Sequence, residues 1–366
     1  MHVLMLTSEF PPRIGGIASH VAELALALRA AGVRVTVVAP ADPPARGPEP
    51  DVLRHSPLLR AQPFADWLLG RWCRRWLRAN PCDLVHVHGL RPLRAALATE
   101  LPVVFTNHTS GFLQTVAAGG RRLRRVGRVL ARCGHVLAPS EELVDAARAA
   151  GYTGPATYVP NGVDATRFTP GEARARRAAW GIPENAVAVV IARRLVAKNG
   201  VIDAARALTR TLAHVHFVFV GDGPERGAIE AVARDAGCAA RAHLVGAVPN
   251  TAMPEIYRAA DLCLLPSLME ATSIAGLEAM ATGRALVGTR VGGIPALIED
   301  GVNGLLVPVR DPDAIAAAVN TLARDPARVR AMGDAARARV EAEFAWPRIA
   351  ARTLAVYSGL LQETPR

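Results

Sequence analysis

Short apolar runs alternate with amphipathic stretches along almost the whole of this chain. The first series begins with HVLMLTS and continues through VRVTVVAP, DLVHVHG, VVFTNHT and HVLAPS, with helical stretches such as GIASHVAELALALRAAG between the runs. Runs of four to seven apolar residues separated by helices are typical of parallel βαβ units. The pattern therefore predicts a doubly wound parallel sheet in the first part of the chain.

A second series of the same kind begins at VAVVIARRL and continues through HVHFVFVGDGP, AHLVGAV, DLCLLPS, ALVGTRVGG and NGLLVPV. The polar stretch at 165–186 separates the two series and shows no strand pattern. A chain of 366 residues has room for two domains. We predict an α/β fold with two Rossmann-like domains, residues 1–165 and 166–345, followed by an amphipathic helix at 346–366.

Charge and cysteine content narrow the class of protein. The formal net charge of +11 favours an anionic partner such as a nucleoside diphosphate, an anionic lipid surface or a nucleic acid. Five scattered cysteines without a C-x-x-C pair predict neither a disulfide framework nor a zinc site, and a cytoplasmic location fits them best. The first residues are typical of a buried strand, not of a signal peptide, and no apolar run is long enough to span a membrane.

Two stretches are candidates for binding an anion. Gly15 and Gly16 stand between the first predicted strand and its helix, where glycine lets the backbone approach an anion and the helix N-terminus offers free N–H groups. Arg193, Arg194 and Lys198 follow the first strand of the second series, and three cations there suit a diphosphate. The simpler alternatives are a plain tight turn and a solvated basic loop.

Two glutamates stand out in LPSLMEATSIAGLEAMATG, residues 265–283. Glu270 is expected in a loop after a strand, Thr272 or Ser273 at the N-cap of the next helix, and Glu278 inside that helix. Carboxylates beside a helix N-terminus can accept hydrogen bonds from sugar hydroxyls while the free N–H groups bind phosphate. The alternative is that Glu270 caps the helix and Glu278 is an ordinary helical residue.

Glu270 and Glu278 also match the E-x7-E motif, and the chain resembles the retaining glycosyltransferases of family 4 (glycosyl transferases group 1). VPNGVD, GDGPE, RAADLCLLPS and the glycine-rich first loop occur in the same order as in that family, and the similarity covers nearly the whole chain. The resemblance implies a GT-B fold, in which two Rossmann-like domains face each other across a cleft and the C-terminal helix returns to the first domain.

The resemblance also implies roles for individual residues. Glu278 would hold the ribose hydroxyls, Glu270 would contact the donor sugar, and an arginine together with Lys198 would hold the diphosphate. The glycines Gly15 and Gly16 would complete the phosphate site. The residues assigned to donor binding are Gly15, Gly16, Arg193, Arg194, Lys198, Glu270, Ala271, Thr272, Ser273 and Glu278, and those assigned to catalysis are His108, Glu270, Arg193 and Lys198.

Two departures from the family pattern leave points open. The family commonly has Gly-Phe after the first glutamate, where this chain has Ala271 and Thr272, so the identity of the donor sugar is open. The usual R-L-x-x-x-K-G occurs as RRLVAKNG, in which spacing from Lys198 selects Arg193 and the Arg-Leu pair selects Arg194. Both arginines remain candidates.

Histidines in the first domain are candidates for the acceptor side. His108 lies in TNHT at the end of a strand, and a similar T-x-H segment in the family places its histidine near the reacting centre. His86 and His88 in LVHVHGL are expected to point to opposite faces of a strand, with structural roles favoured for both. No set of histidine and acidic residues has metal-ligand spacing, so the sequence predicts no required metal and no cofactor.

Two arginine-rich stretches suggest contact with an anionic membrane. FADWLLGRWCRRWLRA, residues 64–79, sets Arg71, Arg74, Arg75 and Arg78 on one helical face and Leu68, Trp72 and Trp76 on another. The stretch at 121–132 puts six arginines around Leu123, Val126 and Leu130. Arginine with tryptophan on a helix is typical of interfacial binding, and a solvated face packed on its own domain is the alternative.

Together these features predict a retaining, metal-independent hexosyltransferase. Its donor would be a UDP- or GDP-linked sugar and its acceptor a hydroxyl of a glycan or a lipid-linked molecule at the inner face of the cell membrane, with no nucleic acid as partner. The alternatives are an enzyme acting on a small soluble metabolite, a sugar-nucleotide epimerase on the same architecture, a non-catalytic sugar-nucleotide binder and a nucleic-acid-binding protein.

Overall fold

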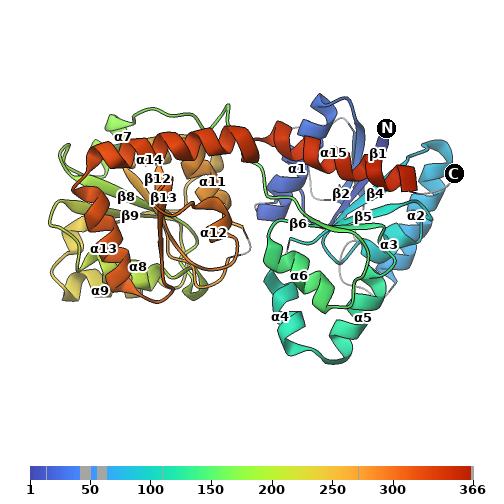
Figure 1. The fold of residues 1–366 in the computed structure, drawn as a ribbon, viewed down its shortest axis with the longest axis horizontal. Coiled ribbons are helices and arrows are strands. Elements are labelled where there is room, and N and C mark those ends of the chain that lie inside the picture. Colours follow the sequence, from blue (N-terminus) through green and yellow to red (C-terminus); the bar gives the residue numbers. More distant parts are fainter. Residues whose placement is uncertain (14, 42–50, 56–63, 109, 271, 364–366) are drawn as a thin grey trace. The chain divides into compact units, whose positions relative to one another are not determined.

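The computed structural model describes residues 1–13, 15–41, 51–55, 64–108, 110–270 and 272–363. The chain divides into two compact units, Met1–Gly162 together with Trp346–Arg366, and Val163–Ala345. Figure 1 shows the elements of each unit in sequence colours. The boundary between the first and second units lies between residues 162 and 163, whereas the sequence pattern predicted it between residues 165 and 166.

The first unit contains a seven-stranded parallel sheet. Its strands are β1 (His2–Thr7), β2 (Arg34–Pro40), β3 (Val52–His55), β4 (Leu84–His88), β5 (Val103–Thr106), β6 (His135–Ala138) and β7 (Ala156–Tyr158), in the order β3-β2-β1-β4-β5-β6-β7. Its helices are α1 (Gly16–Ala30), α2 (Ala65–Ala79), α3 (Leu93–Leu97), α4 (Ser110–Ala118), α5 (Gly120–Leu130), α6 (Glu141–Ala149) and α15 (Trp346–Glu363).

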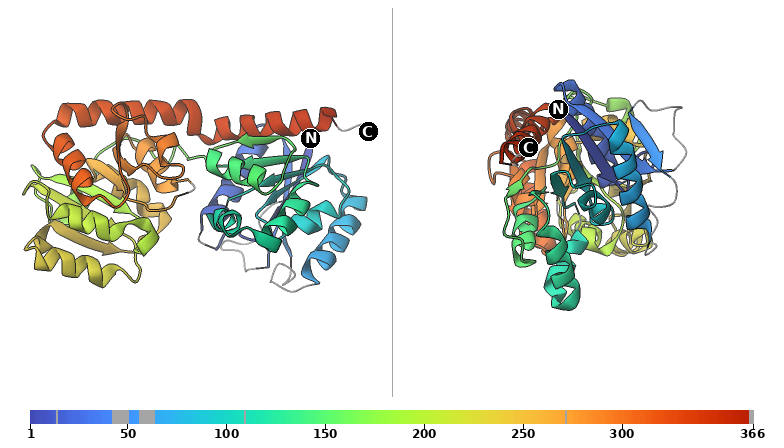
Figure 2. Two further views of the ribbon diagram at one scale, coloured as in Figure 1. Left: turned by 60° about the horizontal axis from the view of Figure 1, so that its bottom comes forward. Right: turned by 90° about the vertical axis from the view of Figure 1, so that its right-hand side faces the viewer.

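Helix α15 belongs to the first unit although it follows the second unit in the sequence. Its apolar face, including Trp346, Ile349 and Tyr357, joins the buried cluster formed by α1 and the central strands, and Figures 1 and 2 show it lying along α1. The Tyr357 hydroxyl lies 2.6 Å from Nδ1 of His86 on β4, which fixes the helix against the sheet. The predicted return of the last helix to the first domain is confirmed.

The second unit contains a six-stranded parallel sheet. Its strands are β8 (Val187–Ala192), β9 (Val215–Val220), β10 (Ala242–Gly246), β11 (Leu262–Leu265), β12 (Ala285–Thr289) and β13 (Gly304–Val307), in the order β10-β9-β8-β11-β12-β13. Its helices are α7 (Arg174–Ala179), α8 (Val201–Leu208), α9 (Arg226–Asp235), α10 (Met253–Arg258), α11 (Ile274–Ala281), α12 (Ile294–Leu297), α13 (Pro312–Ala323) and α14 (Pro326–Arg339).

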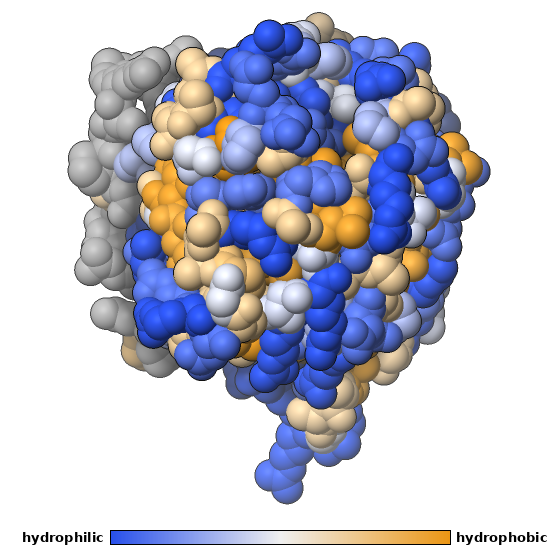
Figure 3. Space-filling model, turned by 90° about the vertical axis from the view of Figure 1, so that its left-hand side faces the viewer, coloured by the Kyte–Doolittle hydropathy of each residue, from blue (hydrophilic) through white to orange (hydrophobic). Residues whose placement is uncertain are grey.

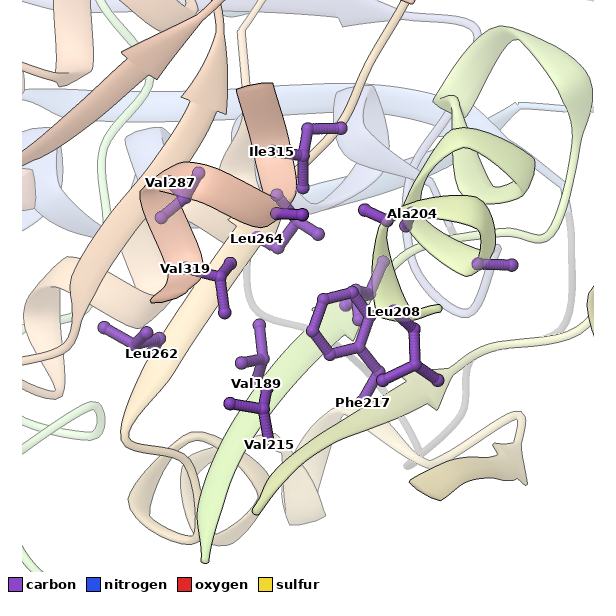
Figure 4. Close-up of a cluster of buried hydrophobic side chains, with 14 of the residues drawn as sticks. Val189, Ala204, Leu208, Val215, Phe217, Leu262, Leu264, Val287, Ile315 and Val319 are labelled. Atoms are coloured by element: carbon purple, nitrogen blue, oxygen red, sulfur yellow. The ribbon is translucent and has the colours of Figure 1, made fainter. Parts of the chain in front are cut away.

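Apolar side chains on both faces of this sheet form the core of the second unit. Figure 4 shows one face, where strand residues such as Val189 and Phe217 meet Leu208 of α8 and Val319 of α13. A second cluster, around Val190, Leu277 and other residues, covers the opposite face. A sheet buried on both faces explains why the strands are continuous apolar runs without alternation.

The surface of the second unit that Figure 3 presents is largely hydrophilic, with apolar residues scattered among charged ones, as is usual for a surface in contact with water. Within the described part of the chain, no helix combines the length and the apolar character that crossing a bilayer requires.

Candidate functional site

Arg193 and Glu270 meet at the carboxyl ends of two neighbouring strands. Arg193 directly follows β8, and Glu270 lies in the loop that follows β11. The Arg193 guanidinium donates hydrogen bonds to the Glu270 carboxylate and to the Ser267 hydroxyl, and the two charged side chains are only 9% and 14% exposed. Burial lowers the pKa of Arg193 to about 10, so the side chain still carries its charge at neutral pH. This pair forms the centre of the candidate site.

The two other cations of this loop lie at the surface. Arg194 and Lys198 are both exposed, and Lys198 sits in a short 3₁₀ turn, Ala197–Asn199. The carbonyl oxygen of Lys198 accepts a hydrogen bond of 2.9 Å from the backbone N–H of Leu268, which ties this turn to the loop that carries Glu270. Arg193 therefore differs from Arg194 in being the arginine that contacts the candidate sugar-binding carboxylate.

Glycines hold this loop in place by allowing close backbone contacts. Gly292 has a φ of +52°, and a Cβ at this position would lie 1.6 Å from the carbonyl oxygen of Glu270. The next residue, Gly293, donates its N–H to the same oxygen at 3.0 Å. Gly200 has a φ of +65°, and a Cβ there would lie 1.8 Å from the carbonyl oxygen of Pro266. Both positions require glycine. The VGG segment (residues 291–293) and the 3₁₀ turn that contains Lys198 therefore hold the loop that carries Glu270 in position.

The Gly-Asp-Gly-Pro turn after β9 supports the same region. A Cβ on Gly221 would lie 2.0 Å from the carbonyl oxygen of Arg193, and one on Gly223 would lie 2.3 Å from that of Leu195. The N–H of Leu195 donates to the carbonyl oxygen of Asp222 at 2.9 Å. This turn therefore packs directly against the arginine loop and supports its backbone.

Helix α11 begins where the sequence placed its N-cap. The Ser273 hydroxyl accepts a hydrogen bond of 3.1 Å from the backbone N–H of Gly276, so Ser273 is the cap and Glu270 is not. Thr272 is half-buried, and Ala271 lies outside the described residues. The alternative in which Glu270 caps this helix is therefore wrong, and its carboxylate instead pairs with Arg193.

Glu278 is buried in the middle of α11. Its side chain is 8% exposed, and it accepts a hydrogen bond of 2.9 Å from the Tyr257 hydroxyl of α10. Burial raises the pKa of Glu278 to about 7, against the opposing effect of the Tyr257 hydrogen bond. A buried carboxylate that keeps free lone pairs is suited to accept further hydroxyl groups, such as those of a ribose.

The raised pKa of Glu278 has a consequence for stability. The unfolded chain releases this proton near pH 4.5, whereas the folded chain keeps it until about pH 7. The stabilisation from the protonated group is therefore complete below pH 4.5 and is lost as the pH rises through 7. Relative to wild type, Glu278→Gln should gain roughly 3 kcal/mol of unfolding free energy between about pH 5 and pH 8.

Denaturant titrations of the ligand-free protein at the two pH values measure this difference. Tyr257→Phe provides a second arm, because it removes the hydroxyl that opposes the pKa shift of Glu278, and the pH dependence should become steeper. Parallel pH profiles for wild type and Glu278→Gln would contradict the prediction.

The glycine-rich loop after β1 lies in the first unit. Helix α1 begins at Gly16, and Gly15 is its N-cap with an extended φ of 174°, a conformation open to any residue. No acidic residue stands in the first turn of this helix, whose residues are all described. The free N–H groups at its N-terminus therefore suit an anion, and the assignment of both glycines to phosphate binding stays a prediction.

The histidines of β4 and β5 do not lie as the sequence analysis expected. His86 and His88 share one face of β4, because residues two apart in a strand point the same way, and their ring centroids are 4.1 Å apart. The expectation of opposite faces was wrong. His86 is buried between Tyr357 and Thr106, both at 2.6 Å, which is a structural role. Nδ1 of His88 lies 2.9 Å from Nε2 of His108, which follows β5.

His20 of α1 completes this group and was missed by the sequence analysis. Its ring centroid lies 4.5 Å from that of His108. Spacing along the chain gave no signal, because the three histidines come from three separate βα connections. The sequence clue for His88 and His108 was their position near the carboxyl end of a predicted strand, whereas His20 lies inside α1 and gave no such clue.

A cavity of about 390 Å³ in the second unit lies away from the candidate site. Asp261 and Arg284, which line it, directly precede β11 and β12, so the cavity opens at the amino ends of the strands. Arg193 and Glu270 stand at the carboxyl ends, where open parallel sheets bind their ligands. Within the cavity wall, Arg177 and Asp261 pair at 2.9 Å.

The arginine-rich helix α2 exposes a different set of apolar residues from the predicted one. Trp72 and Trp76 are half-buried and stack on each other with centroids 6.3 Å apart. The exposed apolar side chains are Phe64, Trp67 and Leu68, at 73%, 58% and 39% exposure. Of the apolar face predicted for this helix, Leu68 is exposed, whereas Trp72 and Trp76 pack against the domain and are not available for interfacial binding.

Helix α5 and its neighbouring residues keep their apolar residues turned inward. Leu123 and Val126 are half-buried and Leu130 is buried, while the surrounding arginines, Arg121, Arg122, Arg124, Arg125, Arg128 and Arg132, are exposed. This helix therefore presents charge without exposed apolar anchors, in contrast to α2.

Comparison with known proteins identifies two family models and several relatives. The model of the glycosyl transferases group 1 matches residues 186–325, and the model of glycosyltransferase family 4 matches residues 14–167. The chain is 32% identical to an alpha-maltose-1-phosphate synthase of Mycolicibacterium smegmatis over 98% of this chain and 99% of the relative. It is 30% identical to a GDP-mannose-dependent alpha-(1-6)-phosphatidylinositol monomannoside mannosyltransferase of Mycobacterium tuberculosis over 96% of each.

Among solved structures, the chain resembles HepE of Anabaena in complex with UDP-glucose. The TM-score is 0.80 at 20% identity, and the similarity covers 98% of this chain and 100% of the other. Each sheet of this chain has a counterpart in that two-domain architecture, so the expected GT-B fold is confirmed.

Proposed function

Because this chain belongs to the family 4 (group 1) glycosyltransferases and is a transferase enzyme, we propose that it moves a hexose from a UDP- or GDP-linked sugar to an acceptor hydroxyl with retention of configuration. The observation that carries the proposal is the buried contact of Arg193 with Glu270 at the carboxyl ends of β8 and β11. This contact places a cation next to a carboxylate. A nucleoside-diphosphate sugar needs a cation for its phosphates and a hydrogen-bond acceptor for its sugar hydroxyls.

Each part of the donor has a matching group in the second unit. The Glu278 carboxylate accepts the ribose hydroxyls, and the Glu270 carboxylate accepts those of the sugar. Arg193 and Lys198 neutralise the negative charge that develops on the diphosphate as the bond to the sugar breaks. The acceptor attacks from the face that the diphosphate leaves, and the leaving phosphate takes the acceptor proton. The reaction then requires neither a protein nucleophile nor a metal.

The experiment that tests this proposal is a panel of UDP-, GDP- and ADP-sugars, scored for binding and for hydrolysis by the wild-type protein. One donor class should bind and turn over, and Glu278→Ala should weaken its binding by more than tenfold while circular dichroism stays unchanged. This loss is expected because two ribose hydroxyls lose a buried hydrogen-bond acceptor. Equal affinity of Glu278→Ala and wild type would remove the ribose assignment.

The same panel separates the alternatives. Release of free nucleoside diphosphate without a glycosylated product in the presence of acceptors would favour the epimerase, and binding without turnover would favour a binder. The two relatives differ in the class of molecule they act on, since one is named for the synthesis of maltose 1-phosphate and the other for mannosyl transfer to a phosphatidylinositol monomannoside. We favour a glycan or lipid-linked acceptor, used in cell-surface polysaccharide or glycolipid synthesis at the inner face of the membrane.

Helix α2 supports this choice of acceptor. Phe64, Trp67 and Leu68 are exposed at its start, and the Arg71 guanidinium lies 5.8 Å from the Trp67 ring centroid. Exposed aromatic residues next to arginines suit the boundary between acyl chains and anionic headgroups, where the rings insert and the guanidinium groups bind phosphate. We propose that α2 attaches the enzyme peripherally to anionic lipid.

Sedimentation with vesicles tests the α2 surface. The protein should co-sediment with vesicles that contain phosphatidylglycerol and not with pure phosphatidylcholine. Trp67→Ala and Arg74→Ala should each weaken binding about fivefold, since each basic residue near such a surface contributes about 1 kcal/mol. Val302→Ala, at an exposed apolar residue of the second unit, is the matched control and should bind like wild type. Equal sedimentation with both vesicle types would end the membrane proposal.

A further inference from the structure

Three imidazoles gather at one edge of the sheet of the first unit. His20 stands near the start of α1, His88 is the last residue of β4, and His108 lies just beyond β5. Strands β1, β4 and β5 are neighbours, so these three βα connections meet at the carboxyl ends of the strands. Each residue can offer one ring nitrogen such that all three nitrogens lie within 4.8 Å of one another. Within the described ranges this is the one such group of three or more ligating side chains.

The cluster contains buried nitrogens without a hydrogen-bond partner. His20 is 5% exposed and His88 is fully buried. Nδ1 of His20 and Nε2 of His88 have no partner among the described residues. A buried polar group left unsatisfied costs about 1–3 kcal/mol, so this arrangement calls for a ligand that such nitrogens can bind.

The cluster is neutral, which is the state that binds metals. Burial lowers the pKa of all three histidines, that of His20 to about 4, and the neighbouring imidazoles oppose protonation of His88 and His108 further. A neutral imidazole keeps a lone pair and needs no proton release to coordinate an ion.

We propose that His20, His88 and His108 form a binding site for a divalent transition-metal ion of the zinc class. Imidazole ligands suit zinc, copper and nickel, and three of them with an open fourth position form a familiar coordination set. Zinc–nitrogen distances of about 2.0–2.1 Å need nitrogens about 3.4 Å apart, which small rotations of these rings provide. Carboxylates are absent from the group, which disfavours magnesium and calcium.

The three histidines are distinct from Arg193 and Lys198, which are proposed to neutralise the diphosphate and belong to the second unit. The ion is therefore not a cofactor of the transfer reaction. It would instead occupy the lone pair of His108, the histidine assigned to the acceptor side, and so inhibit transfer. This consequence rests on the proposed function, whereas metal binding itself does not.

The test uses the untagged full-length protein and the metal alone. Titration with Co²⁺ should produce a visible absorption band that saturates at one equivalent, and Zn²⁺ should abolish it. His20→Asn and His108→Gln should each weaken binding by at least about 100-fold, more than the loss of an outer-shell partner costs. Near-ultraviolet circular dichroism checks that both variants fold. Because the two substitutions lie in different elements, the test can still be made if one variant does not fold.

A second histidine pair supplies the control. Nδ1 of His216 lies 2.9 Å from Nε2 of His243 in the second unit, a pair with two ligands instead of three. His243→Ala should leave the one-equivalent binding unchanged. Saturable binding that His243→Ala removes and His20→Asn spares, or no stoichiometric binding to wild type, would overturn the proposal. Stoichiometric Co²⁺ binding by a protein that transfers no sugar even in its metal-free form would refute the proposed function and leave the metal site standing.

Discussion

Arg193→Ala is expected to lower the kcat of sugar transfer by two to three orders of magnitude, while Arg194→Ala stays within a few-fold of wild type. The sequence pattern leaves both arginines possible, but Arg193 is the one that contacts Glu270 and Ser267, and Arg194 is exposed. Removing one preorganised donor that stabilises transition-state charge typically costs about 10²–10³ in kcat. Steady-state kinetics with the donor found by the nucleotide-sugar panel measures the difference.

The pair of variants also separates catalysis from folding. Arg193→Ala leaves the buried Glu270 carboxylate without its cation, and breaking a buried pair by removing one partner destabilises by about 3–5 kcal/mol. Arg193→Lys keeps a cation and should recover stability more fully than kcat, because a single ammonium cannot reproduce the fork that reaches both Ser267 and Glu270. A larger kcat loss in Arg194→Ala than in Arg193→Ala would reverse the assignment.

The long apolar strands and their division between two domains could be predicted from the sequence, because a strand buried on both faces leaves a short continuous apolar run. The two edge strands of the first sheet could not. Val52–His55 and Ala156–Tyr158 are only half-buried and pair on one side, so they show no apolar run, and the sequence analysis did not identify them as strands.

The positions of the site residues could be predicted from the sequence where those residues follow a single strand. They could be predicted less well where loops from several neighbouring strands come together. The segment from Glu270 to Glu278 lies on one loop and helix, and its N-cap at Ser273 could be read directly. The hydrogen bonds of Arg193 and the cluster around His88 depend on which strands are neighbours, and that information is not local in the sequence. The error over His86 and His88 had a different origin, since the period of two already places them on one face.

Glycine positions carry the remaining information about the site, and Gly292→Ala tests it. Gly292→Ala should reduce kcat/KM at least about 100-fold, because a methyl group 1.6 Å from the carbonyl oxygen of Glu270 forces the loop to move, and a displacement of about 1 Å at a reacting group costs about that much. The variant should also lose stability, since both the clash and a φ of +52° oppose a side chain.

Gly301→Ala is the matched control for this substitution. Gly301 also has a positive φ, +85°, but a Cβ there meets nothing within 4 Å, so alanine should cost about 1–2 kcal/mol of stability and leave kcat/KM near wild type. Thermal unfolding and steady-state kinetics of both variants separate the effect of backbone strain on stability from the effect of a displaced Glu270 on kcat/KM. If the two variants lost the same stability and kept the same activity, the contact between the VGG segment and Glu270 would not position the carboxylate. A selective loss in Gly292→Ala would instead show that the backbone contact between Gly292 and Glu270, as well as the two glutamates, determines donor binding.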